Sequence, residues 1–188
     1  MLIHDLSVLD DSFMEGYRGV LLLHRNKDGE IGNAQRNALK RISSNSKEWL
    51  WHIHEFDQLR RTDPFYTDHR IYSSVNARNM DKSIRLFKER QLEADYDKNE
   101  NHFGFYQDIE NRFFSCFMNP KTALTSYFII DCDLEEARVD ALKFLPEGQL
   151  ILDYPTKNGR HLLTHPFNPT LLANSKAEIK KDALLYIG

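Results

Sequence analysis

Two aspartates follow an apolar run in the stretch Tyr127–Asp133, which reads Tyr-Phe-Ile-Ile-Asp-Cys-Asp. Side chains alternate between the two faces of a β-strand, so Asp131 and Asp133 share one face and Cys132 takes the other. Two carboxylates on one face of a buried strand are unfavourable unless a positive charge lies between them. Mg²⁺ and Mn²⁺ bind oxygen ligands of this kind. The pair therefore predicts a divalent-cation site at the end of this strand.

The elements that position this pair are predicted by the pattern of the chain after residue 125. Apolar and β-branched runs indicate strands, Asp133 is placed to cap the helix after the first strand, and Asn158-Gly159 is a hairpin signal. The predicted elements are a strand over 126–132, a helix over 134–144, strands over 149–154 and 160–164, a helix over 168–181 and a strand over 182–187. This βαββαβ order is that of ferredoxin-like and RRM-like sheets.

This topology predicts which side chains meet. Such sheets usually have the strand order fourth, first, third, second, so the first strand ends where the third and fourth begin. Asp131 and Asp133 end the first strand, Arg160 and His161 begin the third, and Asp182 begins the fourth. A lone aspartate is often only a cap, and a lone histidine often only packs. Their expected convergence nevertheless favours a functional site.

The chemistry that suits this set is metal-assisted phosphoryl transfer. Three carboxylates can hold one or two divalent cations, which clamp the attacking and leaving oxygens. Lys157 and Arg160 could neutralise a triphosphate, and His161 could contact a phosphate oxygen. The protein's part in such a reaction is mainly positioning and electrostatic stabilisation.

The first 125 residues are predicted to form an α/β module. Strands are expected over 19–25 and 70–76, and helices over 33–44, 46–59, about 79–92 and 103–117. Arg70, Asn76 and Arg78 bracket a strand-to-helix junction. Such junctions bind anions through free backbone N–H groups and the helix dipole, so these residues are candidates for nucleic-acid contact. Structural roles for all three remain open.

Composition limits the function classes. The 188 residues carry a formal net charge of −3, and proteins that coat nucleic acid without specificity usually have a basic surplus. The two cysteines, Cys116 and Cys132, do not fit metal-finger spacing and make a disulfide framework unexpected. We expect a cytoplasmic α+β protein without a signal peptide or membrane span. Residues 1–125 would pack on a catalytic RRM-like module formed by 126–188 as one unit.

Three motifs in this order resemble those of the archaeo-eukaryotic primase, or primase-polymerase, superfamily. They are Asp131-Cys-Asp133 after a hydrophobic strand, the run Lys157-Asn-Gly-Arg-His161, and Asp182-Ala-Leu-Leu-Tyr186. The resemblance implies that Asp131, Asp133 and Asp182 are catalytic metal ligands for Mg²⁺ or Mn²⁺. It also implies that the turn bearing Lys157, Asn158, Gly159 and Arg160, together with His161, binds the phosphates of the incoming nucleotide. Gly159 stands where the family more often has serine, and Lys181 stands where a hydrophobic residue usually precedes the last aspartate.

The resemblance covers residues 126–187 and implies nucleotidyl transfer on nucleic acid. The expected partners are a nucleoside triphosphate, single-stranded or template nucleic acid, and a helicase or other replication protein. One alternative is a catalytically reduced module that binds nucleic acid or a protein partner. Another is a metal-dependent nuclease or cyclase on the same fold. An ordinary RNA-binding RRM is disfavoured, because those sheets present aromatic residues where this strand ends in acids.

Overall fold

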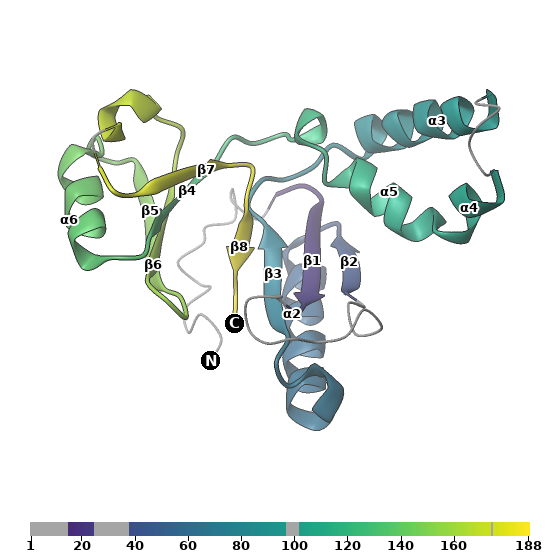
Figure 1. The fold of residues 1–188 in the computed structure, drawn as a ribbon, viewed down its shortest axis with the longest axis horizontal. Coiled ribbons are helices and arrows are strands. Elements are labelled where there is room, and N and C mark those ends of the chain that lie inside the picture. The colour runs from purple at the N-terminus through teal and green to yellow at the C-terminus, as the bar shows by residue number, and fades with distance from the viewer. Residues whose placement is uncertain (1–14, 25–37, 97–101, 174) are drawn as a thin grey trace.

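The computed structural model of the chain describes residues 15–24, 38–96, 102–173 and 175–188. Within these ranges the protein is a mixed α+β structure, as the sequence predicts, and its strands form two four-stranded antiparallel sheets (Figure 1). Its elements in chain order are β1 (Arg18–Leu23), β2 (Leu39–Ser43), α2 (Ser46–Thr62), η4 (Pro64–Tyr66), β3 (Arg70–Ser74), α3 (Met80–Tyr96), α4 (His102–Gln107), α5 (Ile109–Phe117), η5 (Pro120–Thr122), β4 (Phe128–Cys132), α6 (Glu135–Phe144), β5 (Leu150–Pro155), β6 (Arg160–Thr164), η6 (Pro169–Leu172), β7 (Glu178–Lys181) and β8 (Leu184–Tyr186).

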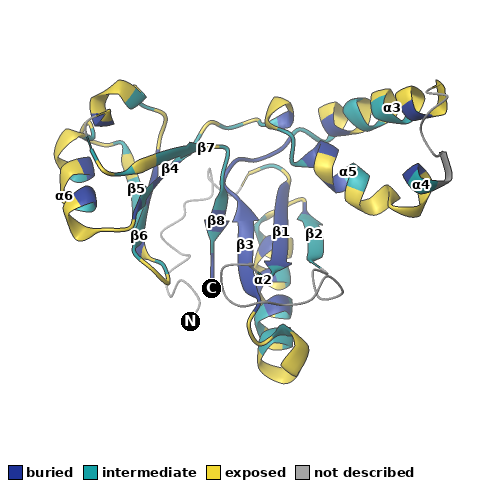
Figure 2. Cartoon of the chain, in the orientation of Figure 1, coloured by how far each residue is buried: buried dark blue, intermediate teal, exposed yellow. Residues whose placement is uncertain are grey.

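The first sheet has the strand order β2-β1-β3-β8, and each neighbouring pair is antiparallel. Helix α2 covers one face, because Trp49, Ile53 and Phe56 recur at helical spacing and are all buried. The indole Nε1 of Trp49 donates to Ser73 Oγ at 2.8 Å, which satisfies the polar atom within this apolar stripe. The opposite face packs against α5, so β1 and β3 are buried along their length (Figure 2).

The second sheet has the strand order β5-β6-β4-β7, again with antiparallel neighbours. Helix α6 covers one face through Ala137 and Ala141, which pack against Ile130 and Cys132 of β4. Because side chains alternate along β4, Asp131 lies on the face away from α6. Asp131 is therefore on the side of this sheet that faces the first sheet.

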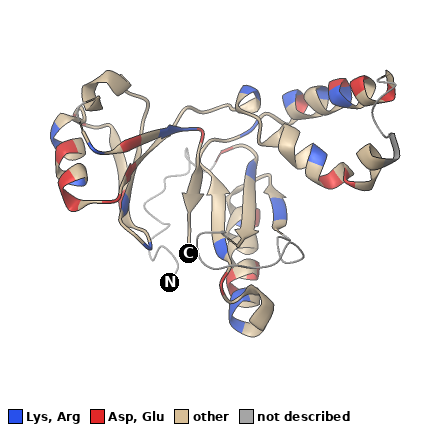
Figure 3. Cartoon of the chain, in the orientation of Figure 1, with Lys and Arg blue, Asp and Glu red and all other residues tan. Residues whose placement is uncertain are grey.

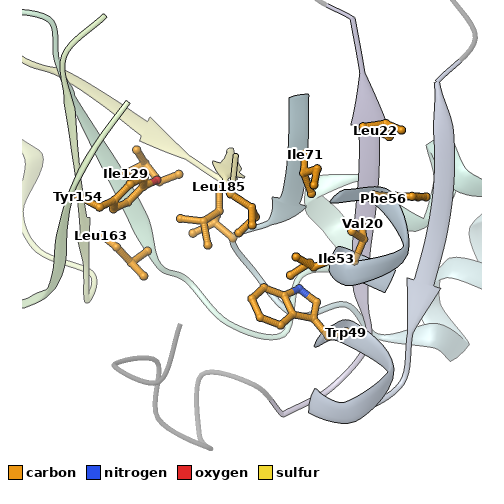
Figure 4. Packing of buried hydrophobic residues seen from close by; sticks show 12 residues of the cluster. Val20, Leu22, Trp49, Ile53, Phe56, Ile71, Ile129, Tyr154, Leu163 and Leu185 are labelled. Atoms are coloured by element: carbon orange, nitrogen blue, oxygen red, sulfur yellow. The ribbon is translucent and has the colours of Figure 1, made fainter. Parts of the chain in front are cut away.

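The two sheets meet at β8 and share one core. Leu185 of β8 belongs to the same buried cluster as Ile129 and Leu163 of the second sheet and Ile71 and Val20 of the first (Figure 4). The short connection after β7 carries the chain from the second sheet into the first. The first sheet thus contains residues from both sides of position 126.

The helix predicted over 33–44 is wrong for residues 39–43. These residues form β2, which pairs with β1 from Arg18↔Ser43 to Leu22↔Leu39. Residues 33–37 lie outside the described ranges. Pairing with a fully buried strand decides the conformation here, and local helical spacing does not.

The helix predicted over 168–181 is also wrong. Asn168 caps only the short 3₁₀ turn η6 that begins at Pro169, and residues 178–181 form β7. β7 takes the fourth position of the sheet beside β4, and the segment expected there pairs instead with β3 as β8. The predicted βαββαβ unit therefore lacks its second helix, and its fourth strand starts at Glu178, four residues earlier than predicted.

Two helix boundaries differ from the prediction as well. Leu134 is the residue that precedes α6, and no side-chain hydrogen bond caps this helix, so Asp133 is not its cap. The predicted helix over 103–117 is divided into α4 and α5 around Asp108. Asp133 is consequently available for other contacts.

Candidate active site at the junction of the two sheets

A pocket of about 230 Å³ lies where the two sheets meet. Its walls come from β4, β6, β7 and the β5–β6 turn on one side, and from β3 and β8 on the other. Acidic and basic residues occur together along β7 where it runs beside β4 (Figure 3). The residues that line the pocket are Arg70, Tyr72, Asp131, Asp133, Thr156, Lys157, Asn158, His161, Glu178, Lys180 and Tyr186.

Asp131 lies at the centre of this set because it pairs across the sheet with His161 on one side and Glu178 on the other. Its Oδ1 is 3.2 Å from His161 Nε2, and its Oδ2 accepts a hydrogen bond from Lys180 Nζ. Both carboxylate oxygens are therefore held by groups from neighbouring strands. The predicted meeting of Asp131 and His161 is confirmed by this register.

His161 has both ring nitrogens engaged. Its Nδ1 is 3.0 Å from the hydroxyl of Tyr154, and Nε2 faces Asp131. Burial lowers the pKa of His161, although the Asp131 charge opposes this shift, and the lower pKa favours the neutral ring. A carboxylate only accepts, so Nε2 carries the proton and the Tyr154 hydroxyl donates to Nδ1. His161 thus orients Asp131, a role that the sequence prediction of a phosphate contact did not include.

Gly159 lets the β5–β6 turn approach Asp133 closely. A β-carbon at this position would lie 2.9 Å from Asp133 Cα and would overlap the carbonyl oxygen of Cys132. The turn itself is closed by a backbone hydrogen bond from Thr156 N to Gly159 O at 2.8 Å. Close packing therefore requires glycine at position 159, although the family more often has serine there. The close approach brings Lys157 and Asn158 into the pocket, as predicted.

Arg160 does not belong to the pocket. It precedes His161 on β6, and adjacent strand residues point to opposite faces. Its Nε donates to Asp153 Oδ1 at 2.7 Å, and Asp153 also receives Arg138 from α6. The expected phosphate contact of Arg160 is replaced by an ion-pair cluster on the α6 side of the sheet.

Asp182 also lies away from the pocket, and its expected convergence with Asp131 is not found. The register pairs Phe128 with Lys181, so Asp182 lies beyond the start of β4, whereas Asp131 lies near the end of that strand. The Asp182 carboxylate is bound by Arg78, with Nη2–Oδ1 at 2.6 Å and Nη1–Oδ2 at 3.0 Å. Because β7 begins at Glu178, that residue occupies the strand-start position predicted for Asp182.

Asn76 and Arg78 take structural positions rather than surface ones. Asn76 Oδ1 accepts from the backbone N–H of Tyr127 at 2.7 Å, and the Arg78 side chain is fully buried beside Asp182. Asn76 holds the start of β4 against the first sheet, and Arg78 holds the connection between β7 and β8. Of the three proposed nucleic-acid contacts, Arg70 is the one that lines the pocket.

The sequence prediction missed five residues of the pocket wall, one of which is Thr156 in the β5–β6 turn. Glu178 and Lys180 were assigned to a helix, although their i, i+2 spacing around Ile179 is the alternation of a strand. Tyr72 and Tyr186 come from β3 and β8, with ring centroids 5.7 Å apart. No local signal places them here, because the pairing of β3 with β8 joins distant parts of the chain.

The carboxylates of the pocket decide whether it could hold a divalent cation. Within the described part of the chain, no three histidine, cysteine, aspartate or glutamate side chains gather closely enough to form a metal site alone. Mg²⁺, however, commonly takes only one or two protein carboxylates and completes its coordination with water and substrate phosphates. Asp131 and Asp133 line one pocket and are the residues that could hold such a cation there.

Comparisons with family models, with curated proteins and with solved structures find no match to this chain. Among the helices that the structure describes, none is long and apolar enough to span a membrane. The geometry of the pocket and the motif resemblance are therefore the two grounds for inferring a function.

Proposed function

We propose that this chain is a small primase-polymerase-like protein that carries out metal-dependent nucleotidyl transfer in the pocket between its sheets. The observation that carries this proposal is that Asp131, Asp133, Lys157 and His161 line one pocket. These four residues come from two motifs that the resemblance expects to act together. The strand order of the second sheet, with β7 as its fourth strand, is also that of an RRM-like module.

The pocket residues divide into two roles in this proposal. Asp131 and Asp133 would hold Mg²⁺ or Mn²⁺, which when bound neutralises phosphate charge and aligns the attacking and leaving oxygens. Lys157 from the turn and Arg70 from β3 would bind the triphosphate from opposite walls. His161 would keep the Asp131 carboxylate in position through its Nε2–H.

Transfer would follow the usual balance of phosphoryl chemistry. A hydroxyl oxygen of the acceptor nucleic acid forms a bond to the α-phosphorus, and the bond from that phosphorus to the bridging oxygen of pyrophosphate breaks. The acceptor's proton would leave to solvent, and pyrophosphate would depart as the leaving group. The motif resemblance also leads us to propose that the chain uses a template and acts with a helicase or another replication protein.

Two observations favour a second candidate, a module that binds nucleotide or nucleic acid without catalysis. Lys180 donates a hydrogen bond to Asp131 Oδ2, an oxygen that a cation bound to this carboxylate would use. Asp182 of the third motif forms an ion pair with Arg78. In that case the pocket would bind phosphate through its basic residues, and the acids would tune affinity. Nuclease and cyclase reactions at the same site are tested by the same assays.

Isothermal titration with Mn²⁺ and a non-hydrolysable nucleoside triphosphate tests the leading proposal. We expect cation-dependent nucleotide binding that Asp131→Asn weakens roughly tenfold or more. Asp140→Asn is the matched control, because it makes the same change at an exposed position on α6. Incubation with labelled nucleotides, primer and template then separates extension from cleavage or cyclisation. Equal binding by wild type and Asp131→Asn would exclude the catalytic proposal.

A further inference from the structure

Lys180 is placed to be more than a surface residue. It pairs with Ile129 across the sheet and shares the face of Asp131 and Glu178. Its Nζ donates to Asp131 Oδ2, lies 3.3 Å from Glu178 Oε2, and belongs to the pocket wall. The neighbouring Lys181 points to the other face, with its Nζ 5.5 Å from the Phe128 ring centroid. Only one of these two adjacent lysines therefore touches the proposed site.

The Lys180 ammonium competes directly with any cation that uses Asp131 Oδ2. Oδ1 of the same carboxylate is 3.2 Å from His161 Nε2, and His161 is itself held by Tyr154, so this side has little freedom to rearrange. Lys180 has that freedom, since its side chain is 37% exposed and its four-carbon stem is flexible. Binding of a cation to Asp131 would release the ammonium into a pocket that also holds Lys157 and Arg70.

We infer that Lys180 is a resident counter-ion of Asp131 that exchanges places with the divalent cation and then binds a phosphate of the nucleotide. This inference rests on the proposed function and adds a regulatory property to it. A cation alone must displace Lys180, so it binds weakly. A nucleotide gives the released ammonium a new partner, so cation and nucleotide bind cooperatively. Linkage requires that each ligand raise the other's affinity by the same factor.

A purely structural ion pair makes a different prediction. Exposed pairs contribute little free energy, and removing one lysine would then act only through net charge. The loss of net charge is the same for Lys180→Gln and Lys181→Gln. Opposite effects on cation and nucleotide affinity, confined to position 180, would not come from net charge.

The test measures Mn²⁺ affinity without nucleotide, and affinity for a non-hydrolysable triphosphate with Mn²⁺, by titration calorimetry. We expect Lys180→Gln to bind Mn²⁺ roughly fivefold more tightly than wild type and the nucleotide roughly fivefold more weakly. Lys181→Gln should leave both affinities near the wild-type values. Lys180→Arg, which keeps the charge, should restore nucleotide affinity. Circular dichroism establishes that each variant is folded.

The outcomes separate this inference from the proposed function. If Asp131→Asn abolishes Mn²⁺ binding but Lys180→Gln behaves like Lys181→Gln, the metal site stands and the role of Lys180 is wrong. If Mn²⁺ binds Lys180→Gln but does not bind wild type even with the nucleotide present, Lys180 blocks the site without exchanging, and both the inference and the wild-type catalytic proposal fail. If neither protein binds Mn²⁺, both are wrong.

Discussion

The Asp182 carboxylate receives two guanidinium nitrogens of Arg78, at 2.6 and 3.0 Å, although its sequence position suggested a metal ligand. Arg78 is fully buried, whereas Asp182 retains 13% exposure of its side chain. The pair joins the β7–β8 connection to the chain that follows β3. An aspartate at the end of a strand can thus neutralise a buried arginine instead of binding a metal ion.

Asp182→Asn should destabilise the protein by about 3 kcal/mol, because it leaves the buried Arg78 guanidinium without its counter-charge. Asp182 has a φ of 53°, and asparagine tolerates this left-handed backbone, so the substitution removes charge without adding strain. Urea unfolding measures the change, with Asp140→Asn as the control on an exposed helix surface. Similar unfolding midpoints for the two variants would contradict this role of Asp182.

Gly159→Ala should lose about 1–3 kcal/mol of stability and also lower nucleotide affinity, because backbone atoms of Cys132 and Asp133 occupy the space of the new methyl group. The turn must move away from Asp133 and carry Lys157 with it. Thermal unfolding and nucleotide titration measure the two effects. Asn158→Ala, in the same turn, removes atoms rather than adding them and should leave stability near that of wild type.

Lys157→Gln and Arg160→Gln should have different effects. Lys157 lines the pocket, so its loss should weaken nucleotide binding several-fold. Arg160 is bound to Asp153 on the α6 side, so its loss should leave nucleotide affinity unchanged and reduce stability modestly. Calorimetric titration and urea unfolding on both variants check this. A larger loss of nucleotide affinity in Arg160→Gln would show that the pocket has been wrongly placed.

Stability should fall as pH decreases below about 6.5, because burial lowers the pKa of His69, with neighbouring His24 and Arg60 acting in the same direction and Asp68 opposing them. His69 then takes up a proton at a higher pH in the unfolded chain than in the folded chain. The stability that neutral His69 contributes is therefore lost as the pH falls below about 6.5. His69→Leu should flatten the change in unfolding free energy between about pH 7.5 and about pH 5.5. His54→Gln, on the exposed side of α2, should leave the slope unaltered.

The sequence predicts the strands and helices whose signals are local. β3, α2, α6, β5 and β6 lie within a few residues of their predicted bounds, because alternation, helical spacing and turn residues act over short distances. The meeting of Asp131 with His161 was also predictable, since it follows from the topology and from the ends of two well-marked strands.

The missed features depend on pairing between distant segments. Residues 39–43 and 178–181 are short edge strands with mixed polarity, and only their buried partners β1 and β4 determine their conformation. A four-residue difference in where the fourth strand begins replaced Asp182 by Glu178 beside Asp131 and brought Lys180 into the site. Arg160 was misplaced for a simpler reason, since alternation along β6 already separates it from His161.

The three-residue strand β8 couples the shape of the pocket to the relative orientation of the two sheets. Leu185 is fully buried in the core shared by both sheets, and Tyr186 next to it lines the pocket. Any rotation of one sheet against the other must therefore bend the chain at Asp182 and Ala183, between β7 and β8. A ligand that contacts both walls of the pocket would restrict this bending. Slower hydrogen exchange at the backbone amide of Leu185 would report that restriction.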